Sequence, residues 1–295
     1  MSSKWRIIDF IEYEGTILSI RGGLQVGDER IALHDVATIL IGESAHYSGS
    51  VVARAAEYGV PIITCNWRQQ PVACTLPWSD NTKVGARHRA QAALTLPRQK
   101  NAWMQIVKSK LRGQASNLAY LSSTDAAEKV WHLSKEVRSG DPNNLEARGA
   151  RTYWANLFPG EKFSRSPGSG AGRNALLDYG YSVLRGLTVR SICAAGLWPS
   201  LGVWHRNRSN VFALADDLVE VFRPAVDYAA IQIREVPETL SREMKHHIVA
   251  VAAEPFGVEG VSVETAITML AQDFAHYVEG RGQKFEVKPW CVTSG

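Results

Sequence analysis

The residue pattern of this chain changes near Pro77, and this change constrains the fold more than any other feature. Before Pro77, short runs rich in Val, Ile and Thr, such as WRIIDFI and TILSIRG, are separated by Gly, Asp and Glu. Runs of this kind are typical of β-strands. After Pro77, apolar residues recur at intervals of three and four among Ala, Gln, Lys and Arg, which predicts amphipathic helices. We therefore predict an α+β fold, with a small β-rich domain over residues 1–78 and a larger all-α domain over 79–295.

Turn and capping residues divide both parts into elements. One helix is expected inside the β-rich part, over SGSVVARAAEYG, and a hairpin is expected in NWRQQPVACTLP. A loop rich in Gly, Pro and Ser over residues 159–174 is expected to be mobile, and residues 281–295 are expected to form a loose tail. The helices expected after Pro77 cover residues 83–96, 98–113, 114–122, 124–138, 141–157, 174–196, 208–227, 239–253 and 261–279.

Basic residues concentrate in the middle of the chain. Residues 76–215 carry 20 Lys and Arg against 8 Asp and Glu, whereas the rest of the chain carries 13 against 21. No acid occurs between Asp80 and Asp125 or between Asp178 and Asp216. A basic stretch of this length predicts a polyanionic partner, most simply nucleic acid. Solvated helix faces paired with the acidic C-terminal part would give the same charge distribution.

Composition excludes several classes of protein. Hydrophobic residues make up 45% of the chain and charged residues 21%, which is typical of a globular protein with a core. No apolar run approaches the roughly 18 residues that span a bilayer, and the N-terminus lacks the apolar stretch of a secretory signal. We therefore expect a cytoplasmic protein with no membrane partner. The cysteines have no zinc-type spacing and are expected to be free thiols. They are Cys65, Cys74, Cys193 and Cys291.

One histidine and an acidic helix attract attention as candidate chemistry. His205 has a tryptophan on one side and cations on the other, and these cations are expected to lower its pKa and favour the neutral, ligating imidazole. A lone histidine is nevertheless more often structural. Asp217 and Glu220 are three residues apart on a predicted helix, so they project from one face. Asp216 and Glu220 fit one face equally well, and acids near a helix start also stabilise it without binding anything.

A third candidate lies further upstream. Glu146 belongs to DPNNLEARGARTYW, a predicted helix whose other nearby charges are the basic Arg148 and Arg151. Its local sequence also fits an ordinary surface charge pattern. Two carboxylates, a histidine and basic surroundings together suggest metal-assisted phosphodiester chemistry.

Separated blocks of the sequence resemble the CRISPR-associated spacer integrase family, the Cas-one proteins. These blocks are DPNNLEARGARTYW, NALLDYGYSVL, AAGLWPSLGVWH and DDLVEVFRP, in the order that the family shows. The β-then-α organisation agrees with the family along nearly the whole chain. The sequences of these blocks and the compact length are most similar to the branch that accompanies a single-protein effector nuclease, the type II systems. One departure is Arg173, which stands before NALL where the family often has Asp.

The resemblance implies a catalytic metal site made of Glu146, His205 and Glu220, which would hold Mg²⁺ or Mn²⁺. It also implies Asp217 as a neighbouring acid and a candidate further ligand. The implied reaction is transesterification, in which the 3′-hydroxyl of a foreign DNA fragment attacks a phosphodiester at the edge of a CRISPR repeat. With water in place of the hydroxyl, the same site would act as an endonuclease. The candidate phosphate-binding residues are Arg148, Arg173, Arg206 and Arg208.

The resemblance also implies partners in a prokaryotic cell. The β-rich domain is expected to form a homodimer, and two such dimers flank a dimer of the small protein Cas-two. This assembly would act on double-stranded DNA, both the foreign fragment and the repeat array, and the type II effector nuclease is a further candidate partner. Two other functions fit the same residues. One is a non-catalytic DNA-binding scaffold, and the other is a repair nuclease that acts on branched DNA.

Overall fold

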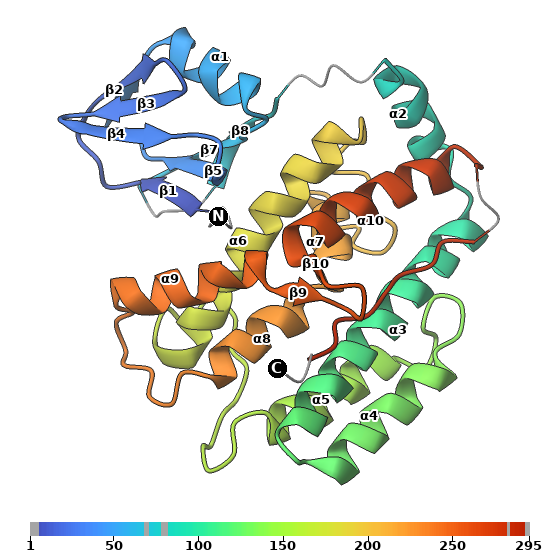
Figure 1. The fold of residues 1–295 in the computed structure, drawn as a ribbon. Coiled ribbons are helices and arrows are strands. Elements are labelled where there is room, and N and C mark those ends of the chain that lie inside the picture. Colours follow the sequence, from blue (N-terminus) through green and yellow to red (C-terminus); the bar gives the residue numbers. More distant parts are fainter. Residues whose placement is uncertain (1–5, 68–70, 78–81, 282–283, 293–295) are drawn as a thin grey trace.

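The computed structural model describes residues 6–67, 71–77, 82–281 and 284–292. A β-rich part is followed along the chain by a larger helical part (Figure 1). This arrangement confirms the predicted α+β fold class. The predicted boundary between residues 78 and 79 lies in the segment 78–81, outside the described residues.

Two four-stranded sheets form most of the β-rich part. In the first, the strand order is β1-β5-β7-β8, with β1, β5 and β7 parallel and β8 antiparallel to β7. In the second, the order is β4-β3-β2-β6. Both sheets and helix α1 share one apolar core that includes Ile17, Leu24 and Ile39. The elements are β1 (Arg6–Phe10), β2 (Gly15–Ile20), β3 (Gly23–Val26), β4 (Glu29–Ala32), β5 (Val36–Ile41), β6 (Ala45–Tyr47), α1 (Gly49–Glu57), β7 (Ile62–Cys65) and β8 (Pro71–Thr75).

The helical part is organised around α6, which lies between the sheets and the other helices (Figure 1). It contacts β5 on one side and α7, α8, α9 and α10 on the other. Among the described residues, no helix is long and apolar enough to cross a membrane. The elements are α2 (Val84–Ala92), α3 (Leu96–Tyr120), α4 (Thr124–Glu136), α5 (Leu145–Asn156), α6 (Gly172–Ala194), α7 (Ala213–Val219), α8 (Arg223–Ile231), α9 (Arg242–Ala250), the 3₁₀ helix η1 (Val251–Ala253), β9 (Pro255–Phe256), β10 (Val261–Ser262) and α10 (Val263–Val278).

In the β-rich part, the predicted helix is confirmed, and the predicted hairpin is present but begins earlier in the chain. The helix expected over SGSVVARAAEYG is α1. The expected hairpin is the antiparallel pair β7–β8, whose first strand lies just before the predicted segment. All four cysteines are free.

Two helix boundaries in the second part were predicted wrongly. The segments 98–113 and 114–122 form the single helix α3. Gly113 does not end this helix, because it lies buried inside it and packs against Pro224, and that packing outweighs the poor helix propensity of one glycine. The helix expected over 208–227 is instead the pair α7 and α8, since Pro224 occupies the first turn of α8, where proline starts a helix rather than continuing one.

The segment after α10 is not the loose tail that the sequence suggested. Phe285 and Trp290 are buried in the main core. Trp290 Nε1 donates a hydrogen bond to Asn117 Oδ1 on α3 at 2.9 Å, and Ser109 Oγ donates to the carbonyl of Lys288 at 2.9 Å. Burial of two large aromatic side chains therefore fixes residues 284–292 along α3.

The Gly-rich loop before α6 is tied to that helix. The guanidinium of Arg165 donates to Asn174 Oδ1 at 2.8 Å and pairs with Asp178. The backbone N–H of Gly168 donates to Asp178 Oδ2 at 2.8 Å. These bonds hold the loop that was expected to be mobile against the first turns of α6.

Candidate active site

The carboxylates of Glu146 and Glu220 converge on the ammonium of Lys110. Lys110 Nζ lies 2.5 Å from Glu146 Oε1 and 2.6 Å from Glu220 Oε2. Arg223 Nη2 lies 3.1 Å from the other oxygen of Glu220. Because two oxygens this close to one nitrogen are also close to each other, α3, α5 and the α7–α8 junction build one cation-binding cluster. We call these four residues the glutamate cluster.

The start of α5 is capped by Asp141 and packed so that Glu146 faces α3. The carboxylate of Asp141 accepts the backbone N–H groups of Leu145 and Glu146, both at 2.9 Å, and so satisfies donors that the helix start leaves open. One turn further, a Cβ on Gly149 would lie 2.2 Å from Leu111 Cδ2 of α3. Any larger residue would have to displace the buried Leu111 side chain, so glycine favours the close packing of α5 on α3 beside Glu146.

The charges of the glutamate cluster stabilise one another. Burial of Glu220 disfavours its charge, but Arg223 and Lys110 outweigh burial and hold the pKa of its carboxyl below the usual range. Burial likewise disfavours the ammonium of Lys110, but Glu220 and Glu146 outweigh it and raise the pKa of Lys110. Glu220 is therefore held as an anion in an almost fully buried position, where it is only 5% exposed.

His205 is oriented by the fully buried Asp217. Its Nδ1 lies 2.7 Å from Asp217 Oδ1, which also accepts the His205 backbone N–H at 3.1 Å. Asp217 Oδ2 accepts the N–H groups of Val203 at 2.6 Å and Trp204 at 3.0 Å. A Cβ on Gly202 would lie 2.8 Å from that oxygen, so glycine lets this turn close on the carboxylate. Asp217 was predicted as a neighbouring acid or further ligand. In the structure, both of its oxygens accept hydrogen bonds that position this loop and the His205 ring. The Nε2 atom of His205 can therefore bind another partner.

The surroundings of His205 differ from the sequence expectation. The hydrogen bond to Asp217 raises the pKa of His205, against the opposing effect of burial, and the charges of Asp217, Glu220 and Asp216 add to the rise. The prediction that neighbouring cations lower this pKa was wrong. The ring contacts the buried carboxylate of Asp217, whereas the side chains of Arg206 and Arg208 are exposed to solvent. Because the charge of Glu220 adds to the rise in the pKa of His205, the imidazole ring lies near the glutamate cluster.

The two aspartates that spacing could not separate have different partners. Asp216 faces α6, where Arg185 Nε lies 2.7 Å from its Oδ1. Asn210 Nδ2 donates to Asp216 Oδ2 at 2.7 Å. Asp216 therefore holds α7 against α6, and Asp217 is the aspartate at His205.

The donor set suits a hard divalent cation. Two carboxylates and one imidazole are ligands that Mg²⁺ and Mn²⁺ accept. Glu220 Oε2 is buried and accepts no aligned hydrogen bond from a described residue, although Lys110 Nζ is in ion-pair contact with it. Lys110 nevertheless lies between the glutamates, and no three His, Cys, Asp or Glu side chains of the described residues are arranged to ligate one ion. The structure brings Glu146 and Glu220 together and places His205 beside them without ligand geometry.

The four arginines predicted to contact phosphates fall into two groups. Arg148 on α5 and Arg206 and Arg208 in the loop before α7 are exposed. Arg173 is instead 9% exposed and pairs with Glu161 at 2.5 Å. Its guanidinium also donates to the carbonyls at the end of α8 and stacks over an aromatic ring. Arg173 thus joins the start of α6 to α8, which argues for a structural role in place of the predicted phosphate contact.

Sequence reasoning missed Lys110 and Arg223, the two cations of the glutamate cluster. Lys110 could have been found, because it falls on the buried face of α3 with Trp103, Ile106 and Val107 at helical spacing. A lysine on an apolar face needs an acidic partner. Arg223 stands in the block DDLVEVFRP, three residues after Glu220, at the spacing of a helical ion pair.

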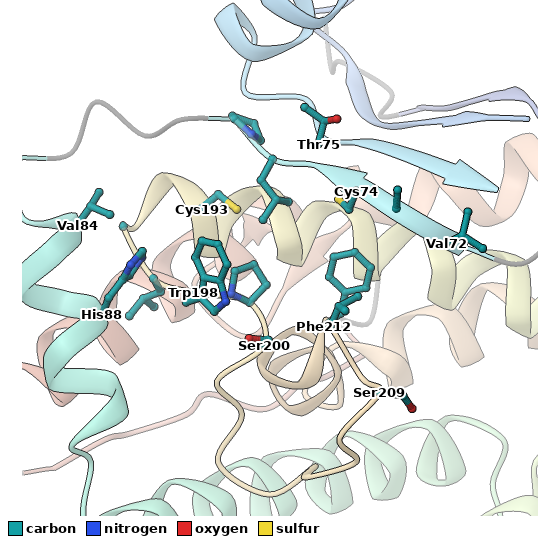
Figure 2. A pocket seen from close by; sticks show the side chains of 17 residues that line it. Val72, Cys74, Thr75, Val84, His88, Cys193, Trp198, Ser200, Ser209 and Phe212 are labelled. Atoms are coloured by element: carbon teal, nitrogen blue, oxygen red, sulfur yellow. The ribbon is translucent and has the colours of Figure 1, made fainter. Parts of the chain in front are cut away.

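A mainly apolar cavity lies away from the glutamate cluster and His205. Its volume is about 770 Å³, and neither Glu146, His205 nor Glu220 lines it. Figure 2 shows Val72 and Cys74 of β8 above it and Phe212 below it. We place the candidate chemistry at the glutamate cluster, because the lining of the apolar cavity contains no carboxylate that could hold a metal ion.

Comparison with known proteins decides the family. The sequence profile described as "CRISPR associated protein Cas1" matches residues 9–239. The chain is also similar to the CRISPR-associated endonuclease Cas1 of Neisseria meningitidis serogroup C (strain 8013), with 31% identity over 260 residues, covering 86% of this chain and 84% of the relative. The chain belongs to the Cas1 family. The Cas1 of Saccharolobus solfataricus named "Cas1 2" is 26% identical over 216 residues, covering 71% of this chain and 68% of that relative.

Solved structures support the same fold. A Cas1 protein from Thermotoga maritima superposes with a TM-score of 0.65 at 17% identity, covering 98% of this chain and 100% of that one. A casposase bound to integration product superposes with a TM-score of 0.70 at 19% identity, covering 95% and 92%. A chain of a Cas6-RT-Cas1–Cas2 complex gives a TM-score of 0.73 at 17% identity, covering 99% of this Cas1-family chain and 37% of that chain. The resemblance stated from sequence is thus confirmed at the level of the family.

Proposed function

We propose that this chain is a metal-dependent DNA integrase and endonuclease of CRISPR spacer acquisition. In the proposed reaction, the 3′-hydroxyl of a foreign DNA fragment attacks a phosphodiester at the edge of a CRISPR repeat. A new phosphodiester forms, and the 3′-oxygen of the repeat strand leaves. The observation that carries the proposal is the convergence of Glu146 and Glu220 on one buried cation beside His205, in a member of the Cas1 family.

The comparisons support the reaction class. The Neisseria relative is named an endonuclease, and the casposase was solved with an integration product. Transesterification and hydrolysis differ only in whether a DNA hydroxyl or water attacks, so one metal site serves both activities.

Each residue has a distinct proposed role. Glu146, Glu220 and His205 Nε2 would hold Mg²⁺ or Mn²⁺, which when bound activates the attacking oxygen and polarises the scissile phosphate. Lys110 would turn away from the glutamates and face the phosphate instead. Asp217 keeps the His205 ring oriented, as carboxylates commonly do for metal-ligating histidines.

DNA would approach across a basic surface. The exposed Arg206 and Arg208 follow His205 directly, and Arg148 lies on the exposed side of α5. Such cations contact phosphates without reading sequence, and each contact makes binding more sensitive to salt.

The partners are proposed from the family. Solved structures similar to this chain include a Cas6-RT-Cas1–Cas2 complex and a Cas1–DNA complex. We infer that this chain binds double-stranded DNA and a Cas2 dimer, and that its β-rich part forms the homodimer contact. A type II effector nuclease as a partner and a cytoplasmic location stay predictions.

Alanine substitutions at the three proposed metal ligands test the function. We expect Glu146→Ala, His205→Ala and Glu220→Ala each to abolish joining of a labelled DNA fragment to a repeat-bearing plasmid with Mn²⁺ or Mg²⁺. DNA binding without metal should remain. Matched controls are Glu136→Ala and His132→Ala on the exposed side of α4, which should keep wild-type activity.

The same assay separates the other candidate functions. Full activity of all three single mutants would reject the assigned site. No joining by the wild type with any divalent ion would favour a non-catalytic DNA-binding scaffold. Faster cleavage of branched DNA than joining at repeats would favour a repair nuclease.

A further inference from the structure

An apolar cavity with a volume of about 320 Å³ lies between α10, the β9–β10 pair and the C-terminal segment 286–291. Buried apolar side chains, Phe222 and Phe256 among them, form its floor. Two apolar side chains at its edge are exposed, Val258 by 94% and Met269 by 41%. An exposed apolar patch that continues into a cavity is typical of a surface that binds another protein. We call this cavity the C-terminal groove.

The turn between β9 and β10 presents Val258 at the edge of the groove. Gly257 and Gly260 flank the turn with φ angles of +68° and +67°, a conformation that favours glycine. The backbone N–H of Gly260 donates to the carbonyl of Gly257 at 3.4 Å, and β9 and β10 pair as antiparallel strands on either side. The backbone of the turn therefore fixes Val258 before any partner arrives, which lowers the entropy cost of binding there.

Two carboxylates of the groove keep their charge available. Asp273 on α10 and Glu286 line the groove and are exposed, and neither makes an ion pair or hydrogen bond with any described residue. The one described cation in the lining, Lys288, is paired with Glu259 at 2.5 Å. The free charge at the groove is thus negative, in a part of the chain, residues 216–295, that carries 13 Asp and Glu against 7 Lys and Arg.

We infer that the C-terminal groove docks a segment of a partner protein that carries large apolar side chains flanked by Lys or Arg. The apolar side chains would fill the groove against Val258 and Met269, and the flanking cations would pair with Asp273 and Glu286. DNA does not suit this surface, because its phosphates would face two unpaired carboxylates. The inference is independent of the proposed function, since docking here needs neither a metal ion nor DNA.

Binding of a synthetic peptide to the full chain tests the inference. The probe is a fluorescein-labelled peptide with two adjacent leucines and two arginines on each side of them, and fluorescence anisotropy measures its affinity. We expect Val258→Ser and Met269→Gln each to weaken binding about tenfold, because apolar side chains at the centre of a contact contribute most of its energy. Val211→Ser is the matched control, since Val211 is 60% exposed but lies outside the groove.

The charges at the groove give a second measurement. A peptide with glutamate in place of arginine should not bind. The double variant Asp273→Asn with Glu286→Gln should bind the arginine peptide about fivefold more weakly at low salt, and this difference should shrink as salt screens the exposed charges. Glu136→Gln on the exposed side of α4 is the matched control and should bind like the wild type.

Two native thiols locate the peptide. Cys291 lines the groove, whereas Cys74 lines the larger apolar cavity beside β8, and both are free and partly exposed. The arginine peptide should slow the modification of Cys291 by N-ethylmaleimide several-fold and leave the rate at Cys74 unchanged, as measured by mass spectrometry. Equal protection of both thiols would overturn the inference.

Other outcomes also overturn it. These are no binding at about 1 mM peptide, equal binding of the glutamate peptide, or unchanged binding in the groove variants. A lower molar mass of Val258→Ser than of the wild type, measured by light scattering without peptide, would assign the groove to a second copy of this chain instead. None of these results bears on strand transfer, so Glu220→Ala tests the proposed function separately.

Discussion

Two buried acids of the helical part are treated in opposite ways by their surroundings. Glu220 faces Lys110 and Arg223, whose charges outweigh its burial and hold its pKa below the usual range. Asp227 on α8 accepts hydrogen bonds from the neutral hydroxyls of Tyr153 and Tyr181. Burial raises the pKa of Asp227 to about 6.

In the proposed function, Glu220 is the acid that is kept charged for metal binding, whereas Asp227 has a structural role. Cations beside Glu220 preserve an anion that a metal ion can use. The network at Asp227 continues through Tyr153 to Asn117, whose Nδ2 donates to the tyrosine oxygen at 2.8 Å, and from there to Trp290. Asp227 therefore connects α8 with α3, α5, α6 and the C-terminal segment, and this role does not require its charge.

The largest expected effect is on strand transfer. Glu220→Gln keeps the shape of the side chain but removes its charge, and should lower strand transfer by more than about 1000-fold, since a bound metal contributes several kcal/mol to such reactions. Asp227→Asn should keep most activity, because hydroxyls can hydrogen-bond to either side chain. Both variants are compared in a gel assay with Mn²⁺, with the exposed Glu136→Gln as control. An equal loss in Asp227→Asn would break the contrast between the two acids.

Removal of Lys110 tests whether it takes the place of a metal ion. Lys110→Met leaves Glu146 and Glu220 without their shared cation, and should cost about 3–5 kcal/mol of stability in EDTA. Mn²⁺ should recover much of this loss by binding the folded state. Thermal unfolding with and without Mn²⁺ measures both, with Lys108→Met on the same helix as control. Mn²⁺ stabilisation no greater than in the wild type would contradict this role.

The raised pKa of Asp227 predicts how stability changes with pH. The folded state holds the proton up to about pH 6, whereas the unfolded state releases it near pH 3.8, the ordinary pKa of an aspartate, so the folded state binds more protons in between. Stability from the protonated carboxyl is full below the unfolded pKa and is lost as pH rises through about 6. The loss is about 3 kcal/mol.

Urea unfolding at a series of pH values measures this effect. Asp227→Asn does not titrate, so its stability relative to the wild type should rise as pH increases through this window. A constant difference between the two proteins across the series would contradict the assignment of Asp227 as the titrating group.

The smallest effect is expected for a substitution of Asp217, the residue that orients the His205 ring. Asp217→Asn would turn an amide N–H₂ toward backbone N–H donors or the His205 ring, and should raise the Mn²⁺ concentration for half-maximal strand transfer about 10- to 100-fold. Asp216→Asn is the matched control on the same helix, because its partner is Arg185 rather than His205. Equal shifts in both variants would show a general weakening of α7 instead of a specific loss of ring orientation.

Local sequence signals predicted most elements and the family. Gly59, the Asp141-Pro142 pair and the alternating β-branched runs mark real boundaries because their effects act within a few residues. The glycine signal failed at Gly113, where packing against the distant Pro224 lets one helix continue. Pro224 itself marks a real boundary, since it lies in the first turn of α8, and the single helix predicted over 208–227 ignored that local signal. The tail prediction failed for a similar reason, since two aromatic residues among polar ones gain their energy only from a core elsewhere in the chain.

The sequence by itself determined most of the strands and helices, the basic middle of the chain, and the candidate residues Glu146, His205 and Glu220. Tertiary structure alone decided that Lys110 lies between the glutamates, that Asp217 rather than Asp216 orients His205, and that α10 and the C-terminal segment form an apolar groove. The physical reason is the separation along the chain over which each effect acts. Backbone preferences and periodicity act between near neighbours in the chain, whereas ion pairs, buried hydrogen bonds and stacked rings depend on which distant segments the core brings together.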